Sequence, residues 1–331
     1  MTDHAPTVAV IGAGMSGATA ARTLADAGLA VTLFEKSRGP GGRMSTRRAP
    51  PWTFDHGAQY VTARGPAFRR AMATWVEAGI AAPWHGRLVD IEDGVVTPHP
   101  SRHPRYVGVP AMNSICKHLL GDLPLVRGVR IGRVVRDQGQ WDLRDDAGAS
   151  RGRFDAAVIT APPEQAAALL HDAPALAAEA RRAELAPCWT WMAAFDEPTG
   201  IEFDGAFVKH GPLSWIARDH SKPERPGAGE TWVAQARAPW SIVHVDDDPN
   251  RVARVLEETF RADTGYDGPA PSQVMVHRWL YAFPVRDLGR AFLWDERTRI
   301  GACGDWVLGE RVESAWTSGD ALARHLAAYV S

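Results

Sequence analysis

Cysteine is scarce in this chain of 331 residues: only Cys116, Cys188 and Cys303 occur, far apart, without disulfide or metal-site spacing. Such usage is typical of a reducing compartment, so we expect a cytoplasmic protein. The first residues lack a basic segment followed by an apolar core, so no signal peptide is predicted. No uninterrupted apolar run approaches the ~18 residues of a membrane-spanning helix, so no membrane association is expected.

An excess of charge of either sign is also missing. The 37 Lys and Arg residues nearly balance 39 Asp and Glu residues, and no long basic run occurs, so nucleic acid is not an expected partner. HExxH and CxxC patterns are absent, so no metal is predicted, and no Ser-His-Asp or Cys-His signature is visible. Tryptophan, by contrast, is abundant at 13 residues, which indicates either core packing or an aromatic ligand site.

The most informative segment lies near the N-terminus. An apolar run over 8–11 is followed by the glycine-rich stretch 12–17, an alanine-rich segment over 18–27 and a second apolar run over 30–34 that ends in Glu35. This order of strand, glycine turn, helix, strand and acid predicts a mononucleotide-binding βαβ unit. Its candidate dinucleotide-binding residues are Gly12, Gly14, Ser16, Gly17 and Glu35.

Each glycine of the unit has a physical role. Gly12 allows a tight turn, Gly14 lets a pyrophosphate approach the backbone, and Gly17 lets the helix pack closely on the sheet. The helix N-terminus then offers unpaired N–H groups to phosphates. Glu35 lies close to the ~20-residue spacing of an acid that binds an adenosine ribose, and its charge disfavours a 2′-phosphate.

The rest of the chain alternates between two kinds of pattern. The periodicity predicts helices over 66–78, 112–120, 166–180 with a break at Pro174, 250–264 and 313–329. Extended segments are predicted for a hairpin that includes Val129 and turns at 138–139, and for 154–160, 189–195, 231–236, 273–279 and 300–306. Residues 83–107 read as irregular or hairpin-like.

These patterns predict an α/β fold with a discontinuous Rossmann-like domain and an α+β substrate domain built on an antiparallel sheet. We expect the nucleotide domain to comprise residues 1–60, 108–186 and 291–331. The substrate domain is expected to comprise residues 61–107 and 187–290.

Four motifs in order resemble those of the amine-oxidase-like flavoproteins, which bind FAD in a two-domain fold, and the resemblance covers nearly the whole chain. After Glu35 these are the segments 36–44 (KSRGPGGRM), 54–60 (FDHGAQY), 158–162 (VITAP) and 303–319, which begins CGDW. In detail the chain is most similar to the bacterial renalases. The segments carrying this closer likeness are 36–39, 55–60, 221–225 and 277–282.

Noncovalent FAD is expected, because Cys303 precedes the C-terminal glycine motif and no cysteine suited to a covalent flavin link lies within that motif. The resemblance places Gly42 and the cations Arg38 and Arg43 along the dinucleotide, Asp305 at the ribityl chain, and a helix N-terminus after Val312 at the flavin. Asp305 alone could equally be a helix cap, and Val129, whose backbone would meet the adenine, could be a core valine. The remaining cofactor-binding candidates are Lys36, Gly57, Ala58 and Gln59.

The resemblance also implies a reaction. The substrate would be a 2- or 6-dihydro isomer of NAD(P), with O2 as electron acceptor and NAD(P)+ and H2O2 as products. Because chemistry is centred on the flavin, no catalytic side chain is assigned. The substrate-pocket candidates are aromatic residues and one histidine: Trp215, Trp232, His277, Trp279 and Tyr281. Lys222 and Arg225 could meet substrate phosphates or simply belong to an exposed loop.

Two other functions remain open, and a third is weakened by the sequence. The first is a flavin-dependent amine oxidase on the same fold, and the second is a flavin-binding protein without turnover. An NAD-dependent dehydrogenase is disfavoured by the FAD-type motifs at both ends of the chain. The preferred dihydronicotinamide isomer, the choice between NAD and NADP, and the oligomeric state are not fixed by the sequence.

Overall fold

The computed structural model describes residues 5–227 and 229–330, and its contacts divide the chain into two compact units. Unit 1 comprises residues 1–42, 115–185 and 284–331, and unit 2 comprises residues 43–114 and 186–283. Residues 43–60 and 108–114 were expected in the nucleotide domain and instead belong to unit 2. The reason is packing: Phe54 is fully buried in an apolar cluster with Met192, Ala194 and Val233 of unit 2.

Unit 1 is built on a six-stranded sheet in the order β10-β2-β1-β14-β21-β20. Its pairs are parallel except that β20 (Leu293–Asp295) runs antiparallel to β21 (Ile300–Ala302). The central strands β1 (Thr7–Ile11), β2 (Ala30–Glu35) and β14 (Ala156–Ile159) are apolar and β-branched, and β10 is Leu125–Arg127. Such continuous apolar runs suit a parallel sheet covered on both faces.

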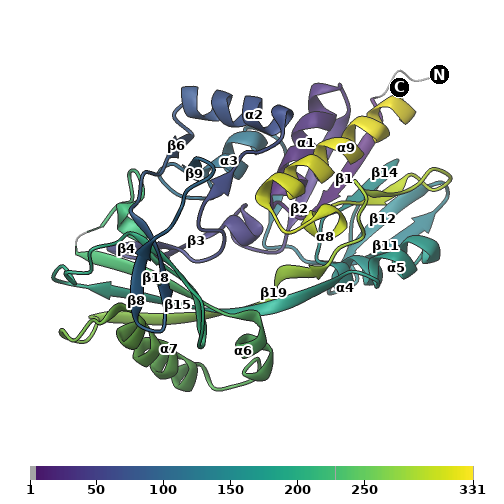
Figure 1. Ribbon diagram of the computed structural model, residues 1–331. Helices are drawn as coiled ribbons and strands as arrows, with labels where there is room; N and C mark the ends of the chain where they lie inside the picture. The colour runs from purple at the N-terminus through teal and green to yellow at the C-terminus, as the bar shows by residue number, and fades with distance from the viewer. Residues whose placement is uncertain (1–4, 228, 331) are drawn as a thin grey trace. The chain divides into compact units, whose positions relative to one another are not determined.

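Two helices pack against each other in unit 1. Helix α1 (Met15–Asp26) joins β1 to β2, and α9 (Val312–Val330) lies beside it, as the purple and yellow helices of Figure 1 show. A Cβ atom placed on Gly319 would lie 2.3 Å from the Ser16 carbonyl oxygen. The contact between the two helices therefore requires glycine at position 319.

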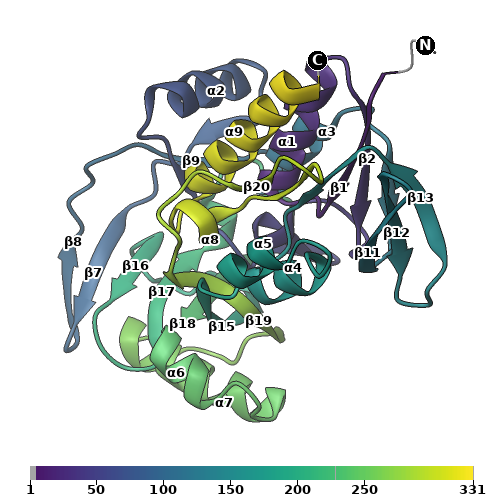
Figure 2. The same ribbon diagram turned by 90° about the vertical axis from the view of Figure 1, so that its right-hand side faces the viewer.

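Unit 1 also carries an antiparallel sheet of β11 (Ile131–Asp137), β12 (Gln140–Asp145) and β13 (Ser150–Phe154), visible in Figure 2. The expected turn at 138–139 is present, with positive φ at both residues, as a tight hairpin needs. The segment 154–160, expected to form one strand, is divided between the end of β13 and β14. The helix expected over 166–180 is two helices, α4 (Pro163–Leu169) and α5 (Pro174–Ala180), as the proline predicted.

Unit 2 is built on a seven-stranded sheet in the order β19-β15-β18-β17-β16-β7-β8. Strand β16 (Gly205–Val208) pairs in parallel with β7 (Leu88–Glu92), whereas the pairs β15–β18, β18–β17, β17–β16 and β7–β8 are antiparallel. The other strands are β15 (Glu184–Phe195), β17 (Leu213–Arg218), β18 (Glu230–Ala236), β19 (Gln273–Arg286) and β8 (Val95–Pro98). The antiparallel sheet expected for the substrate domain is therefore present.

Helix α7 (Pro249–Thr264) covers one face of this sheet (Figures 1 and 2). Asp248 caps its N-terminus by accepting hydrogen bonds from the amides of Asn250 and Arg251. Val252, Leu256 and Phe260 recur every four residues and are buried against Trp191, Trp232 and other apolar side chains of the sheet. One face of the sheet thus forms the main core of unit 2 together with α7. Other elements of unit 2 lie on the opposite face.

Those elements are short. They are the hairpin of β3 (Thr46–Ala49) and β4 (Trp52–Asp55), and a small sheet of β5 (Val61–Thr62), β9 (Arg105–Gly108) and β6 (Ala81–Pro83). Helices α2 (Pro66–Glu77) and α6 (Ala238–Val243) complete unit 2, α3 (Ser114–Leu120) crosses into unit 1, and α8 (Asp305–Leu308) belongs to unit 1. Within residues 5–227 and 229–330 no helix has both the length and the apolar character needed to cross a membrane.

The last turn of α7 makes stability depend on pH. Burial raises the pKa of Asp263 to about 6, and its Oδ2 atom is buried without a hydrogen-bond partner among the described residues. Because the folded state holds this proton more tightly than the unfolded state, stability should fall as pH rises from about 4 to 6. We expect Asp263→Asn to raise the melting temperature at pH 7.5 and to change it little at pH 4. Asp267→Asn, at an exposed position nearby, is the control, and equal shifts at both pH values for Asp263→Asn would contradict this assignment.

Candidate functional site

The glycine turn of unit 1 has the geometry that a dinucleotide needs. Gly12 adopts φ +108°, and a Cβ on Gly17 would lie 2.0 Å from the Gly12 carbonyl oxygen, so the turn and the helix touch through backbone alone. A Cβ on Gly14, by contrast, would have only ordinary contacts, the nearest with Gly42 Cα at 3.8 Å. Packing within the protein therefore requires glycine at positions 12 and 17. At position 14 the protein has room for a Cβ atom, so a requirement for glycine there would come from a bound ligand.

A second glycine segment lies along the turn. Gly41 forms a parallel bridge with Gly14, and its amide donates to the Ala13 carbonyl at 2.9 Å. No side chain caps the N-terminus of α1, where Gly14 is the N-cap residue. Two backbone segments without side chains and an uncapped helix N-terminus together form a cradle suited to a pyrophosphate.

Glu35 at the end of β2 is fixed beside this cradle. Its side chain is 6% exposed, its Oε2 accepts from the Ala13 amide at 2.9 Å, and its Oε1 accepts from the Ser37 amide at 2.8 Å. Each carboxylate oxygen has a second lone pair, so the pre-oriented group can still accept from ribose hydroxyls. The structure thus positions Glu35 as the sequence predicted.

The side chain of Ser16 is engaged within the protein. Its hydroxyl donates to the Cys303 thiol at 3.1 Å, so only its backbone is left for a ligand at the helix N-terminus. Cys303 is fully buried, and burial raises the pKa of its thiol to about 12. A buried neutral thiol is a poor nucleophile, which fits a noncovalently held group.

The other cofactor candidates of unit 1 lie around the turn. Lys36 is exposed and donates to Gln165 at 3.3 Å, and Arg38 is exposed with no polar partner within the described residues. Val129 was expected on a strand but lies between β10 and β11, because its amide donates to the Glu35 carbonyl instead of joining a ladder. That bond holds Val129 against the end of β2.

Asp305 and Val312 both stand at helix starts. Asp305 is the first residue of α8, is 7% exposed, and accepts from the amide of its neighbour Trp306 at 2.9 Å, whereas the N-cap residue is Gly304 and no side chain caps this helix. Val312 begins α9, as expected. The first turn of α9 carries the buried Glu313, which pairs with Arg311 at 2.8 Å and contributes negative charge at that end of the helix.

Four cofactor candidates belong to unit 2: Arg43, Gly57, Ala58 and Gln59. A Cβ on Gly57 would lie 1.9 Å from the Arg43 carbonyl oxygen, which also accepts from the Ala58 amide at 2.7 Å. The Gly57 carbonyl accepts from Gln235 at 2.6 Å, and Arg43 Nη1 donates to the Ala282 carbonyl at 3.0 Å. These bonds fix the segment 57–59 on the face of the sheet opposite α7.

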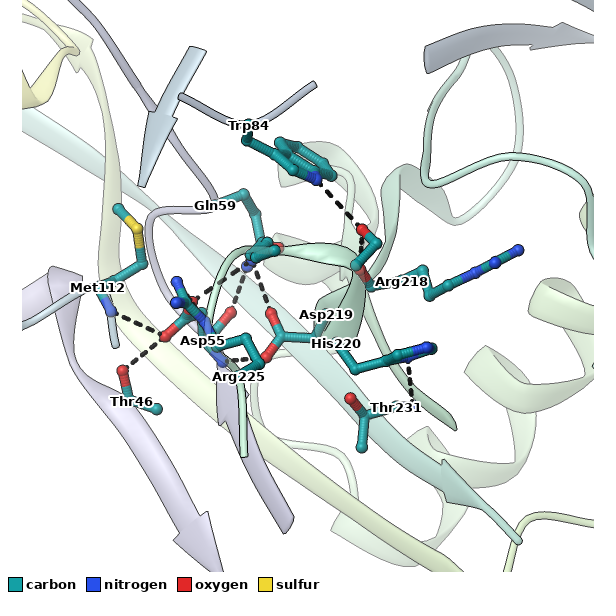
Figure 3. Close-up of polar contacts among 12 residues, drawn as sticks. Thr46, Asp55, Gln59, Trp84, Met112, Arg218, Asp219, His220, Arg225 and Thr231 are labelled. Atoms are coloured by element: carbon teal, nitrogen blue, oxygen red, sulfur yellow. Dashed lines mark hydrogen bonds and ion pairs between the residues drawn. The ribbon is translucent and has the colours of Figure 1, made fainter. Parts of the chain in front are cut away.

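A buried ion cluster of Asp55, Asp219, Lys222 and Arg225 lies under that segment (Figure 3). Arg225 donates to Asp55 Oδ2 through Nε at 2.9 Å and Nη2 at 2.6 Å, and Lys222 Nζ lies 2.6 Å from Asp219 Oδ1. All four side chains are at most 1% exposed. The expectation that Lys222 and Arg225 meet substrate phosphates, or lie on an exposed loop, is therefore wrong.

The formal charges of the cluster cancel, although burial raises the pKa of Asp219, and the cluster is linked to Gln59. Burial alone would raise the pKa of Asp55, but Lys222 and Arg225 outweigh it and hold that pKa below its ordinary value. Lys222 Nζ also donates to Gln59 Oε1 at 3.2 Å, and Gln59 Nε2 donates to the Asp55 and Gly57 carbonyls. The charges thus act through Gln59 to orient the segment expected to pass beside the flavin.

Two histidines and a tryptophan meet on the same face of the sheet. The ring of His277 lies 4.9 Å from that of His56 and 4.3 Å from that of Trp279, whose Nε1 donates to the His56 carbonyl at 2.9 Å. Burial, with a contribution from Arg47, lowers the pKa of His56 to about 3 and that of His277 to about 4. Both imidazoles are therefore neutral at physiological pH and can donate or accept hydrogen bonds.

The five predicted pocket residues are not all together. Trp215 packs with Tyr60 at 5.5 Å and with Trp84 at 6.4 Å between ring centroids. Trp232 was expected in the pocket but is fully buried in the core against α7, because its strand register turns it to the opposite face. Tyr281 is half-buried on β19, two residues beyond Trp279.

Sequence reasoning missed Asp55, His56 and Asp219 as site residues. Asp55 and His56 stand inside a quoted motif, but burial of charged and polar side chains has no local signature. Asp219 lies in a short 3₁₀ turn, 164 residues from the Asp55 amide that donates to it at 3.0 Å. Only the tertiary fold brings these groups together.

Comparison with known proteins supports the nucleotide unit. A family model described as NAD(P)-binding Rossmann-like domain matches residues 10–75. Over 54 residues the chain is 46% identical to a 4,4′-diapophytoene desaturase of Staphylococcus aureus, an alignment covering 16% of this chain and 11% of the desaturase. The chain thus aligns with about a tenth of the length of its curated relatives.

Solved structures extend the likeness to the whole fold. A putative protoporphyrinogen oxidase from Exiguobacterium sp. 255-15 superposes with a TM-score of 0.79 at 14% identity, over 99% of both chains. Cyclohexylamine oxidase from Brevibacterium oxydans IH-35A gives a TM-score of 0.74 at 14% identity, over 98% of this chain and 99% of that one. The fold is therefore the α/β fold of these oxidases, with a Rossmann-like parallel sheet and an antiparallel sheet.

The contrast between Gly14 and Gly17 gives a test of the cradle. We expect Gly14→Val to leave the melting temperature of the cofactor-free protein within about 1 °C, because the chain leaves room there, and to lower FAD affinity at least about tenfold through a clash with pyrophosphate. Gly17→Ala should instead destabilise the fold, because its Cβ would collide with the Gly12 carbonyl. FAD titration and thermal unfolding of both variants provide the measurements. Wild-type FAD affinity in Gly14→Val would contradict the assignment.

The ion cluster predicts a large penalty for removing one charge. Arg225→Ala leaves the buried Asp55 carboxylate without its bidentate partner, and breaking such a pair costs about 3–5 kcal/mol. Arg87→Ala, which breaks the exposed pair with Glu202, is the matched control and should not change the urea midpoint measurably. Equal urea midpoints for the two variants would show that the cluster is not the anchor described here.

Proposed function

We propose that the protein is an FAD-dependent oxidoreductase that oxidises 2- or 6-dihydro isomers of NAD(P) and uses O2 as the electron acceptor. The observation that carries the dinucleotide part is the open Gly14 position beside a fixed Glu35. The fold shared with cyclohexylamine oxidase and the protoporphyrinogen oxidase supports an oxidase of this general type. The proposed choice of substrate depends on residues of unit 2.

The residues of unit 1 fit the adenosine and pyrophosphate parts of FAD. The uncapped α1 N-terminus and the glycines at 14, 41 and 42 would hold the pyrophosphate, and Glu35 would accept from the ribose. Arg38, exposed and unpaired within the described residues, would balance the phosphate charge. When bound, FAD would supply the hydride acceptor and pass the electron pair to O2, giving H2O2 and NAD(P)+.

The histidine face of unit 2 favours a neutral planar ring attached to an anionic group. His56 and His277 are neutral, and the field of Arg47, which helps to lower both pKa values, is positive. A positive field disfavours an ammonium group and favours the phosphates of a dinucleotide. Trp279 and His277 would contact the dihydronicotinamide ring, and a donor that becomes aromatic on losing hydride requires no general base.

An amine oxidase is the second candidate. Its support is the fold likeness to cyclohexylamine oxidase and to putrescine oxidase, the latter with a TM-score of 0.70 at 14% identity. Such an enzyme would take its substrate as the neutral amine between aromatic walls, for which Trp215 and Trp279 are available. A flavin-binding protein without turnover is the third candidate.

Anaerobic mixing separates these functions. We expect purified, FAD-loaded protein to lose its yellow absorbance rapidly with 2- or 6-dihydro-NAD(P) and to remain oxidised with NADH and with amines such as putrescine and cyclohexylamine. Stopped-flow absorbance near 450 nm, the region of the oxidised flavin band, is the measurement. Bleaching by an amine alone would replace this proposal with the second candidate. No bleaching by any donor would leave only the binding protein.

A further inference from the structure

A second pocket lies in unit 2, lined only by residues 83–105. It has a volume of about 260 Å³ and is lined by Pro83, Trp84, His85, Gly86, Leu88, His99, Ser101, Pro104 and Arg105. None of these side chains is acidic. Ligand pockets for drug-sized molecules usually have about 300–1,000 Å³, so this one suits a single small group.

Arg105, the first residue of β9, carries an uncompensated charge in this pocket. A guanidinium has five N–H donors, yet the hydrogen bond that it makes within the described residues runs from Nη1 to the Ser101 hydroxyl at 2.7 Å. No carboxylate of those residues pairs with it. A partly buried cation without a counter-charge is costly, so the arrangement favours a ligand that supplies one.

The guanidinium is held in place by aromatic rings. Its central carbon lies 5.0 Å from the ring centroid of Tyr60 and 6.0 Å from that of Phe207. These contacts stabilise a cation without hydrogen bonding to it, so its planar donor edge is pre-oriented and still available. A planar fork of this kind matches the two oxygens of a carboxylate or phosphate.

The neighbouring groups strengthen this preference. Asp90, the carboxylate that contacts the lining residue His99, is already paired, because its Oδ2 contacts His99 Nδ1 at 3.0 Å and its Oδ1 contacts Lys209 at 2.5 Å. The His99 ring is held against Phe207 at 4.3 Å between centroids. The lining residues therefore present a cation, two imidazoles and a hydroxyl, and the carboxylate bound to His99 is also paired with Lys209.

We propose that this pocket is a binding site for a single oxyanionic group, a phosphate or a carboxylate, held by the fork of Arg105. The ligand is either a free small molecule or a larger molecule whose remainder extends outside the pocket. The lining residues include none of the cofactor candidates, although one of them, Trp84, packs against the substrate-pocket candidate Trp215.

The test uses calorimetric titration of the purified full chain, saturated with FAD to occupy the glycine cradle, with inorganic phosphate and, separately, with benzoate. The two probes distinguish a phosphate site from a carboxylate site. We expect Arg105→Gln to weaken binding of the preferred probe about ten- to hundredfold, the usual loss for hydrogen bonds to a charged group. Arg102→Gln removes the same charge from an exposed neighbouring position and should bind like the wild type.

A pair of substitutions at Ser101 tests the idea without removing Arg105. Ser101→Glu supplies the carboxylate that the guanidinium lacks and should abolish binding, whereas the uncharged Ser101→Gln should retain it within about threefold. Because Ser101 is exposed, both variants should fold. Binding unaffected by Arg105→Gln and by Ser101→Glu, or no binding of either probe to the wild type, would overturn the proposal. Neither result would bear on flavin binding or on anaerobic bleaching.

Discussion

Contact between backbones with no side chain in between is the constraint on which both units depend. A Cβ on Gly17 would collide with the Gly12 carbonyl, one on Gly319 with the Ser16 carbonyl, and one on Gly57 with the Arg43 carbonyl. The first contact shapes the phosphate turn, and the second lets α9 pack on α1. The third holds the segment 57–59 in place. In each case a single added carbon would displace a functional segment.

Polar burial supplements these contacts in unit 2. The neutral cluster of two carboxylates and two cations costs desolvation energy, and only its close geometry and shared hydrogen bonds offset that cost. Through Lys222 and Gln59 the cluster orients the segment 57–59, whereas the nearby histidines stay uncharged because they are buried close to Arg47. Opposite charges thus pair within the cluster, and the two imidazoles beside the segment are neutral.

Much of the fold could be predicted because its signals are local. The turn glycines, Glu35, the hairpin at 138–139, the break at Pro174 and the start of α9 each depend on a few neighbouring residues. The errors arose where distant packing decides. Trp232 lies in the core because of strand register, Val129 leaves the ladder to bond Glu35, and Lys222 and Arg225 are buried against Asp55, which is far away in the sequence.

The sequence by itself determined the dinucleotide-binding turn and the two-part α/β architecture, since periodicity and glycine spacing encode them within short segments. Only the tertiary structure decided which side of the antiparallel sheet each aromatic residue occupies, which charges are paired, and which remain unpaired, as Arg105 does. The physical reason is that burial and ion pairing depend on groups brought together from remote parts of the chain. No local pattern specifies such partners.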